Sequence, residues 1–142
     1  MNDLIKQLAI RSFQVSDEPD VIKLWHRCNL VVPQNDPHKD IEMKLHMQPE
    51  LFLVGLISGR IVSTVMSGYD GHRGWIYYLA VDPDFQQNGI GRRMVEKTEL
   101  KLRKLGCSKI NLQVRKSNRS VIAFYQRIGF LDDDVLGMGK RL

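Results

Sequence analysis

The chain has 142 residues, of which 43% are hydrophobic and 26% are charged. These values are typical of one folded domain with one buried core, and they exclude a disordered or fibrous protein. The net charge of +5 attracts polyanions, either a nucleic acid or a smaller phosphorylated molecule. Residues 1–8 are too polar for a signal peptide, and no run approaches the ~18 apolar residues of a membrane span. We therefore expect a single cytoplasmic domain over residues 1–142 with no membrane partner.

The amino-terminal part predicts a strand followed by two helices. A loose apolar alternation over residues 5–13 suits the strand. Pro19 lies in the first turn of a helix that ends near Asn29. Asp36 and Pro37 repeat this signal as the cap and the first residue of a second helix.

Three apolar, β-branched runs follow, and they predict an antiparallel meander. Ser58 and Gly59 form a two-residue connection between the runs 51–57 and 60–69, which is typical of a hairpin. A second short connection leads to the third strand at 75–81.

Residues 80–94 link the meander to a long helical pattern. Pro83 ends the strand, and Gly89 and Gly91 have no Cβ to keep a phosphate away. The N–H groups of the first helical turn carry the positive end of the helix dipole. The sequence therefore predicts an anion site at this helix start.

The carboxyl-terminal part predicts two helices separated by a strand. The first helix ends at Gly106 and buries Ile90, Met94, Thr98, Leu102 and Leu105. A strand at 109–114 would run parallel to the third meander strand, because such crossovers are right-handed. Asn118 would cap the last helix, and Phe130 with residues 135–142 would add one or two strands.

This order of elements predicts an α+β fold. The sheet would be mixed and mostly antiparallel, with a parallel central pair. Where antiparallel pairing changes to parallel pairing, two strands can diverge at their carboxyl ends and leave a crevice for a ligand.

Two nucleotide-binding motifs do not fit the glycine loop. A Rossmann fingerprint needs a third glycine where Met94 stands, and a Walker loop needs Lys and Ser or Thr where Arg92 and Arg93 stand. The basic side chains that follow suit a solvated helix face better than ligand contacts.

The whole pattern is more specific. Gln86, Gly89 and Gly91 match the Gln/Arg-x-x-Gly-x-Gly/Ala loop of the GNAT family of acetyl-CoA-dependent N-acetyltransferases, and Tyr125 begins a Tyr-x-x-x-Gly-Phe ending that the family also has. The chain resembles this family over nearly its whole length, and it looks most like small bacterial acetyltransferases of the YpeA type. The resemblance implies a GNAT-like fold with helices on both faces of the sheet.

The resemblance also implies where acetyl-CoA binds. Loop N–H groups would hold the pyrophosphate, and Leu79 and Val81 would pair through their backbones with the pantetheine arm, as an added strand would. Asn118 would contact the cofactor, although a helix cap is an equal alternative. The predicted cofactor-binding residues are Leu79, Val81, Gln86, Gln87, Asn88, Gly89, Ile90, Gly91, Arg92 and Asn118.

Tyr125 is the predicted catalytic residue. In the family a tyrosine at this place protonates the departing thiolate, whereas the alternative is a core aromatic beside Phe124. The general base is open, because no partner pattern singles out one candidate. The candidates are Asp70, His72, Asp82 and Tyr78.

We therefore expect direct acetyl transfer from acetyl-CoA to a primary amine, of a small molecule or of a protein. Cys28 and Cys107 lie where neither a nucleophile nor a disulfide or metal site is expected, so we predict no covalent intermediate and no metal. A non-catalytic acyl-CoA-binding module is the alternative from another class. A nucleic-acid binder rests on charge alone, and we expect no such partner. The identity of the amine and the oligomeric state, with a homodimer as one alternative, are open.

Overall fold

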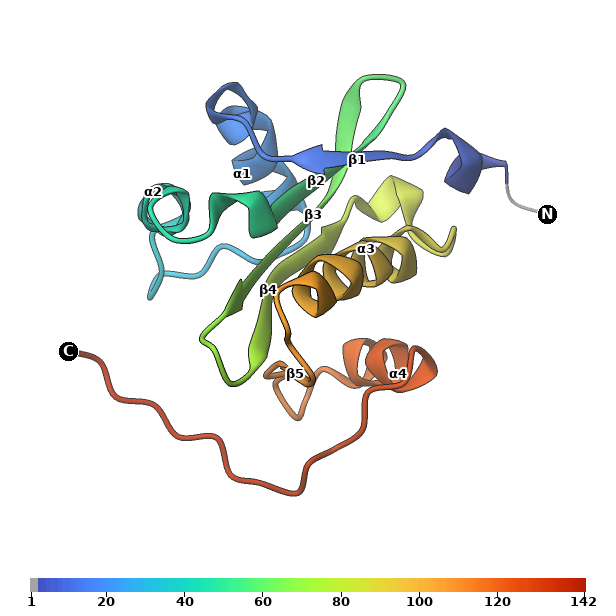
Figure 1. The fold of residues 1–142 in the computed structure, drawn as a ribbon. Coiled ribbons are helices and arrows are strands. Elements are labelled where there is room, and N and C mark those ends of the chain that lie inside the picture. Colours follow the sequence, from blue (N-terminus) through green and yellow to red (C-terminus); the bar gives the residue numbers. More distant parts are fainter. Residues whose placement is uncertain (1–2) are drawn as a thin grey trace. The chain divides into compact units, whose positions relative to one another are not determined.

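A five-stranded sheet forms the frame of the larger part of the chain (Figure 1). The structure is a computed structural model that describes residues 3–142. Met1 and Asn2, which the predicted domain includes, lie outside the described residues. The chain divides into two compact units, with the boundary between Asn111 and Leu112.

The strands lie side by side in the order in which they occur in the chain. They are β1 (Ala9–Ser12), β2 (Phe52–Ile57), β3 (Arg60–Tyr69), β4 (Gly74–Val81) and β5 (Ile110–Asn111). β1 to β4 pair antiparallel, and β5 pairs in parallel with β4. The predicted mixed, mostly antiparallel sheet is confirmed. The parallel pair forms an edge of the sheet rather than its centre, because residues 112–142 contain no strand.

Helices cover both faces of this sheet. They are α1 (Glu18–Arg27) and α2 (Pro37–Leu45) on one face and α3 (Ile90–Lys104) on the other (Figure 1). Successive strand residues point to opposite faces. Val54 belongs to the apolar cluster that contains residues of α1, whereas a Cβ on Gly55 would lie 3.0 Å from the Sδ atom of Met94 in α3.

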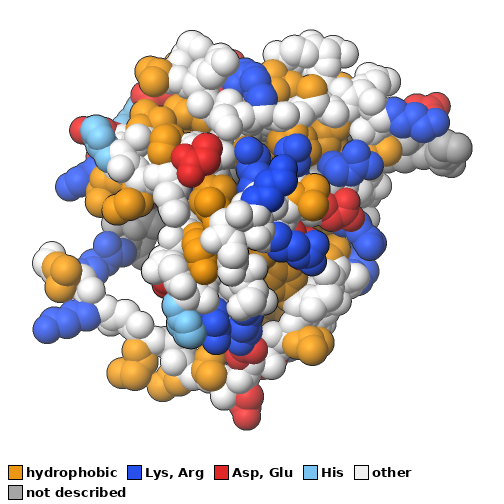
Figure 2. Space-filling view, in the orientation of Figure 1, with side chains coloured by type: hydrophobic (Ala, Val, Ile, Leu, Met, Phe, Trp, Pro, Cys, Tyr) orange, Lys and Arg blue, Asp and Glu red, His pale blue; other side chains and the backbone are white. Residues whose placement is uncertain are grey.

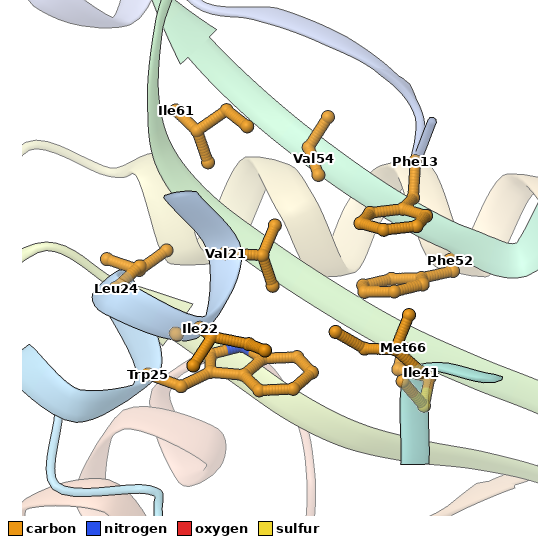
Figure 3. Close-up of a cluster of buried hydrophobic side chains, with 11 residues drawn as sticks. Phe13, Val21, Ile22, Leu24, Trp25, Ile41, Phe52, Val54, Ile61 and Met66 are labelled. Carbon is orange, nitrogen blue, oxygen red and sulfur yellow. The ribbon is translucent and has the colours of Figure 1, made fainter. Parts of the chain in front are cut away.

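The main core lies between the sheet and the helices α1 and α2 (Figure 3). The ring of Phe13 stacks on that of Phe52 with 4.5 Å between centroids, and Trp25 packs against Phe52 at 6.2 Å. Trp25 and Phe52 are fully buried. Removing such a ring from water stabilises the fold by ~2 to 3 kcal/mol, so this cluster fixes α1 against the sheet.

The predicted helix signals are largely confirmed. The Asp36 carboxylate caps α2 by accepting hydrogen bonds from the N–H groups of His38 (3.0 Å) and Lys39 (3.3 Å). Gly106 follows α3 in the left-handed conformation that favours glycine, with φ of 94°. Leu105 was predicted to be buried but is 47% exposed, because it lies beyond the last residue of α3.

Two strand predictions are wrong in extent. The first strand is shorter than 5–13, because Leu4–Gln7 forms a 3-10 helix instead. The strand predicted at 109–114 covers only Ile110–Asn111, because β4 pairs with it at only two positions.

The smaller unit contains α4 (Arg119–Arg127) and no strand. The strands predicted at Phe130 and at 135–142 are therefore wrong. Three successive aspartates at 132–134 and the glycines at 137 and 139 disfavour extended pairing. Several apolar side chains of this segment are exposed, namely those of Leu131, Val135, Leu136, Met138 and Leu142.

None of the helices in residues 3–142 combines the length and the apolar character that crossing a bilayer requires. Over the same residues, no three His, Cys, Asp or Glu side chains are grouped so that they could hold a metal ion.

Candidate functional site

The carboxyl-terminal half of β4 has an open edge, on which no strand of residues 3–142 pairs. Its parallel pairing with β5 ends at Trp75 and Asn111, and β4 continues beyond this point to Val81. The N–H of Asp82 donates to Val62 of β3 (2.8 Å), so the alternation of a strand turns the N–H and C=O of Val81 away from β3. This edge can accept an extended ligand as an added strand.

A β-bulge shapes the same half of β4. Met66 pairs with Tyr77 and Thr64 pairs with Ala80, so Tyr78 and Leu79 together lie opposite one residue of β3. Tyr78 has a left-handed backbone with φ of 49°, a conformation that costs about 1 kcal/mol or more in a residue with a side chain.

Hydroxyl groups of β3 compensate for the ladder bonds that the bulge disrupts. Thr64 donates its hydroxyl to the carbonyl oxygen of Tyr78 (2.9 Å), and Ser63 donates to that of Ala80 (2.6 Å). Both hydroxyl residues are fully buried. The bulge is therefore a defined feature of the fold, and bulges are common next to active sites.

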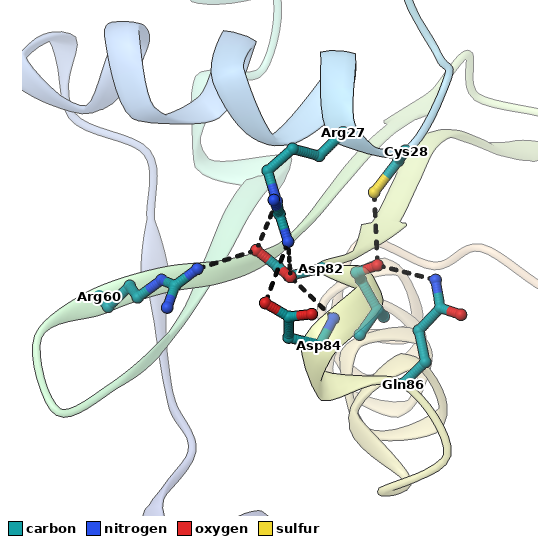
Figure 4. A network of polar contacts seen from close by, with 7 residues as sticks. Arg27, Cys28, Arg60, Asp82, Asp84 and Gln86 are labelled. Carbon is teal, nitrogen blue, oxygen red and sulfur yellow. Dashed lines mark hydrogen bonds and ion pairs between the residues drawn. The ribbon is translucent and has the colours of Figure 1, made fainter.

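The carbonyl oxygen of Val81 is contacted by two side chains (Figure 4). Gln86 donates its amide to this oxygen at 3.1 Å, and the thiol of Cys28 donates to it at 3.3 Å. The structure thus brings Val81 and Gln86, two of the predicted cofactor-binding residues, into direct contact. Gln86 also fixes the path of the chain between β4 and α3.

Asp82 anchors the beginning of the glycine loop. Its buried carboxylate accepts two hydrogen bonds from Arg27 (2.8 and 3.1 Å) and one from Arg60 (3.2 Å) (Figure 4). It also accepts from the N–H of Asp84 (2.9 Å). The hydrogen bonds from Arg27 hold the pKa of Asp82 below its ordinary value. An anion held by two guanidinium groups is a poor base, so this candidate loses its support.

A small cavity lies beside this anchor. Its volume is about 200 Å³, and it is lined by Asp20, Lys23, Leu24, Arg27, Arg60, Ile61 and Asp82. Arg60 also lies over the ring of Phe85, 5.3 Å from its centroid. The acidic and basic side chains of this lining largely neutralise one another. Arg27, Arg60 and Asp82, which anchor the loop, are part of the lining, so we assign the cavity to that anchor.

The glycine loop leads into α3 in the way that anion binding requires. Gly89 is the N-cap of α3 and has φ of 80°, and Gln87 also has a left-handed backbone. Asn88 donates its side-chain amide to the carbonyl oxygens of Phe85 and Gln86, both at 2.9 Å. Gly89 has no side chain, so the N-cap residue makes no capping hydrogen bond to α3. The positive end of the helix dipole therefore faces the loop without a carboxylate or hydroxyl from the N-cap residue.

Basic side chains gather over α3, with acidic ones between them (Figure 2). Arg92 pairs with Glu96 at 3.1 Å and Arg93 pairs with the same carboxylate at 3.8 Å. All three are exposed, so these ion pairs contribute little to stability. Arg92 lies in the first turn of α3, close to the predicted anion site.

Two further candidates for the general base, Asp70 and His72, lie in the turn between β3 and β4. Asp70 accepts hydrogen bonds from the N–H groups of His72 (2.8 Å) and Arg73 (2.7 Å), which hold its pKa below its ordinary value and close the turn between β3 and β4. His72 is exposed in that turn. A carboxylate that accepts two backbone hydrogen bonds is a poor base, and within residues 3–142 the His72 imidazole makes no hydrogen bond that would orient it.

Tyr78, the remaining candidate for the general base, is fixed by its contacts and does not ionise readily. Its ring stacks on Trp25 with 3.9 Å between centroids, and its hydroxyl donates to Asp40 Oδ2 at 2.6 Å. Burial and the hydrogen bond to Asp40 raise its pKa well above the ordinary value of a tyrosine. Its phenol therefore stays protonated and acts as a donor.

Asn118 and Tyr125 lie in the smaller unit. Tyr125 is buried and packs edge-to-face against Phe124 (5.1 Å) and Phe130 (5.3 Å), and burial raises its pKa to about 12. Asn118 is the N-cap residue of α4, but its side chain makes no capping hydrogen bond. Its Oδ1 instead accepts from Ser120 at 3.4 Å.

Sequence reasoning missed Arg27, Arg60 and Asp40. Their partners lie far along the chain, so no local spacing points to them. A basic residue in the last turn of a helix, such as Arg27 in α1, is also common because it interacts favourably with the helix dipole. The sequence alone therefore does not reveal that Arg27 binds Asp82.

The sequence and the fold both match known proteins. The pattern of the acetyltransferase (GNAT) family matches residues 18–130. The chain is 49% identical over 135 residues to "Acetyltransferase YE1169" of Yersinia enterocolitica, covering 95% of this chain and 96% of the relative. It is 48% identical over 136 residues to "Acetyltransferase SG1711" of Sodalis glossinidius, again covering 95% and 96%.

Solved structures share the fold. One is the PaiA N-acetyltransferase from Thermoplasma acidophilum in complex with coenzyme A, with a TM-score of 0.74 and 17% identity over 92% of this chain and 93% of that one. Another is AAC(6')-Iy in complex with a bisubstrate analogue, with a TM-score of 0.78 and 16% identity over 95% and 99%.

Proposed function

Because the chain belongs to the acetyltransferase (GNAT) family, we propose that it transfers an acetyl group from acetyl-CoA directly to a primary amine. The observation that carries the proposal is the open edge of β4 followed by the uncapped start of α3. The first can pair with an amide-containing arm, and the second can hold a pyrophosphate. Acetyl-CoA combines both chemistries in one molecule.

The donor would lie along β4 and the glycine loop. Leu79 and Val81 would pair with the amide groups of the pantetheine arm. Their position at the open edge supports this role, and so does the fold shared with a CoA-bound protein. The N–H groups of the loop and of the first turn of α3 would hold the pyrophosphate. These positions are Gln86, Gln87, Asn88, Gly89, Ile90, Gly91 and Arg92.

In the reaction, the nitrogen of the neutral amine attacks the thioester carbon. A bond forms between carbon and nitrogen, the bond between carbon and sulfur breaks, and coenzyme A leaves as a thiolate. Tyr125 would give its proton to that sulfur, and its raised pKa of about 12 keeps the proton available at neutral pH. The proton of the amine would leave through water. A backbone N–H of β4 would stabilise the oxyanion.

The proposed enzyme is one domain over residues 1–142 that acts in the cytoplasm. The family match supports the single domain, because it spans both compact units. Asn118 would contact the cofactor, which is supported by the absence of a capping hydrogen bond from its side chain.

A thiol-release assay with acetyl-CoA and a library of amines tests the proposal. Amino acids, peptide N-termini, lysine peptides, polyamines and aminoglycosides would be compared, and acetyl-CoA binding would be measured in parallel by calorimetry. We expect binding of acetyl-CoA and release of thiol with at least one amine. Binding without release over the whole library would favour a non-catalytic acyl-CoA-binding module. Absence of binding would reject both functions.

A further inference from the structure

Asp40 and Tyr78 form a contact on the side of the sheet that α1 and α2 cover. Asp40 lies in α2 and is half-buried. The Tyr78 hydroxyl donates to its Oδ2 atom at 2.6 Å, which is short for such a bond and typical of a carboxylate acceptor. The contact joins α2 to the residue of β4 with the left-handed backbone.

Tyr78 is held from three directions. Its ring stacks on the fully buried Trp25, at 3.9 Å and with 12° between the ring planes. The indole N–H of Trp25 donates to the Thr64 hydroxyl at 2.9 Å, and that hydroxyl donates to the Tyr78 carbonyl oxygen. Asp40 holds the far end of the side chain. The position of the Asp40 carboxylate is therefore fixed relative to the bulge.

The charge of Asp40 is not neutralised in the way that the charges of the buried carboxylates Asp17 and Asp82 are. Asp17 pairs with Arg11 at 2.7 Å, and Asp82 pairs with Arg27 at 2.8 Å. Asp40 has a neutral phenol as its partner, and among the described residues no cation lies within salt-bridge distance of it.

One atom of the carboxylate remains available. Among residues 3–142, Oδ1 of Asp40 has no hydrogen-bond partner, whereas Oδ2 accepts from Tyr78. Lys44, one helical turn later, donates its ammonium to the Ser67 carbonyl oxygen and not to Asp40. A half-buried carboxylate with a free oxygen attracts a cation more strongly than an exposed one, since screening by water is weaker there.

We propose that Asp40, oriented by Tyr78, binds a positively charged acceptor amine beside the β4 bulge and so makes the enzyme selective for cationic amines. The inference rests on the proposed acetyl transfer and deepens it. In the proposed reaction, the bulge lies where β4 would present the thioester. Asp40 is a positioning and selectivity residue, since it holds the acceptor before the amine loses its proton. The occupied acceptor site would bring the amine toward the open edge of β4.

Two substitutions separate the charge of Asp40 from its tether to Tyr78. Asp40→Asn removes the charge, but its side-chain oxygen still accepts from Tyr78. Tyr78→Phe removes the hydroxyl and keeps the charge. Asp36→Asn is the matched control, because it removes a negative charge from the same helix while asparagine remains a good N-cap.

The probes are n-butylamine and cadaverine, which are cationic at mildly alkaline pH, and methoxyamine, which is uncharged there. Thiol release gives kcat/KM for each. We expect Asp40→Asn to lose about tenfold with the cationic probes and much less with methoxyamine. Asp36→Asn should keep the preference for cations. An equal loss with charged and uncharged probes, or no loss, would overturn the proposal.

A binding measurement keeps the inference independent of turnover. Trp75→Phe leaves Trp25, stacked on Tyr78, as the single tryptophan, so its fluorescence reports amine binding at this place. We expect cadaverine to change this fluorescence in the Trp75→Phe protein, and about tenfold more cadaverine to be needed after Asp40→Asn. An unchanged titration after Asp40→Asn overturns the inference. Failure of the proposed acetyl transfer appears separately, as absence of thiol release with every amine.

Discussion

Arg27 and Asp82 are joined by two hydrogen bonds, of 2.8 and 3.1 Å, between the last turn of α1 and the first residue after β4. The neighbouring Cys28 contacts the Val81 carbonyl oxygen, and Trp25 stacks on Tyr78. The end of α1 therefore holds three residues of β4 and its extension. In this way α1 fixes the part of β4 that has the open edge.

We predict that Asp82→Asn lowers the free energy of unfolding by about 2 kcal/mol, because it weakens charge-assisted hydrogen bonds to a buried group. Urea titration at neutral pH measures the change. Asp84→Asn is the matched control, since that carboxylate is largely exposed and pairs with Arg27 at 3.2 Å. A loss after Asp84→Asn as large as the loss after Asp82→Asn would contradict the special role of the buried anion.

The same anchor predicts how stability depends on acid. The folded-state pKa of Asp82 is lowered, chiefly by hydrogen bonds from Arg27, relative to an ordinary value of 3.8. Its contribution is therefore fully present above the unfolded pKa and is lost as pH falls through the lower folded pKa. Asp17, whose pKa is lowered by Arg11, adds a loss of the same sign.

Urea midpoints measured from neutral to strongly acidic pH check this dependence. We expect the wild-type midpoint to fall below pH ~4 and the Asp82→Asn midpoint to fall less steeply there. Parallel curves for the two proteins would show that Asp82 does not contribute to acid unfolding.

The backbone geometry of the glycine loop, which is the proposed donor site, could be predicted in part from the sequence. Gln86, Gly89 and Gly91 lie in one short segment, and their spacing follows from local backbone requirements at a helix start. The contact between Asp40 and Tyr78, which we propose to orient the acceptor, could not be predicted. Asp40 and Tyr78 are 38 positions apart, and their contact depends on a bulge that the alternation of β4 does not reveal.

The carboxyl-terminal strands show a different limit. Apolar residues such as Val135 and Leu136 favour a strand locally, but a strand also needs a partner for its N–H and C=O groups. The aspartates at 132–134 and the glycines at 137 and 139 disfavour a strand, and residues 130–142 have no regular secondary structure.

The backbone of Gly89 gives a third prediction. Its φ of 80° strains any residue with a Cβ, although such a Cβ would have no atom within 4 Å. Gly89→Ala should therefore cost about 1 kcal/mol in stability and weaken acetyl-CoA binding, because relief of the strain shifts the loop N–H groups.

Gly59→Ala is the matched control for this effect. Gly59 has φ of 77° in the hairpin between β2 and β3, and a Cβ there would also have no neighbour within 4 Å. The two variants should lose similar stability, measured by thermal unfolding. Calorimetry should show weaker acetyl-CoA binding for Gly89→Ala alone, and equal affinities in the two variants would argue against the loop as the pyrophosphate site.

The last prediction concerns Tyr125. If its hydroxyl protonates the leaving thiolate, Tyr125→Phe should lower kcat by ~100-fold while acetyl-CoA affinity and thermal stability stay nearly unchanged. Tyr69→Phe is the control, because it removes an exposed hydroxyl that donates to the Gly71 carbonyl oxygen. Because the pKa of Tyr125 is about 12, the wild-type rate should not fall through loss of this proton at mildly alkaline pH.

Stopped-flow or steady-state thiol release across neutral and alkaline pH measures both effects. An unchanged kcat in a folded Tyr125→Phe protein would assign this tyrosine to packing with Phe124 and Phe130. The thiolate would then take its proton from water, since a thiol is acidic enough to leave without a strong acid.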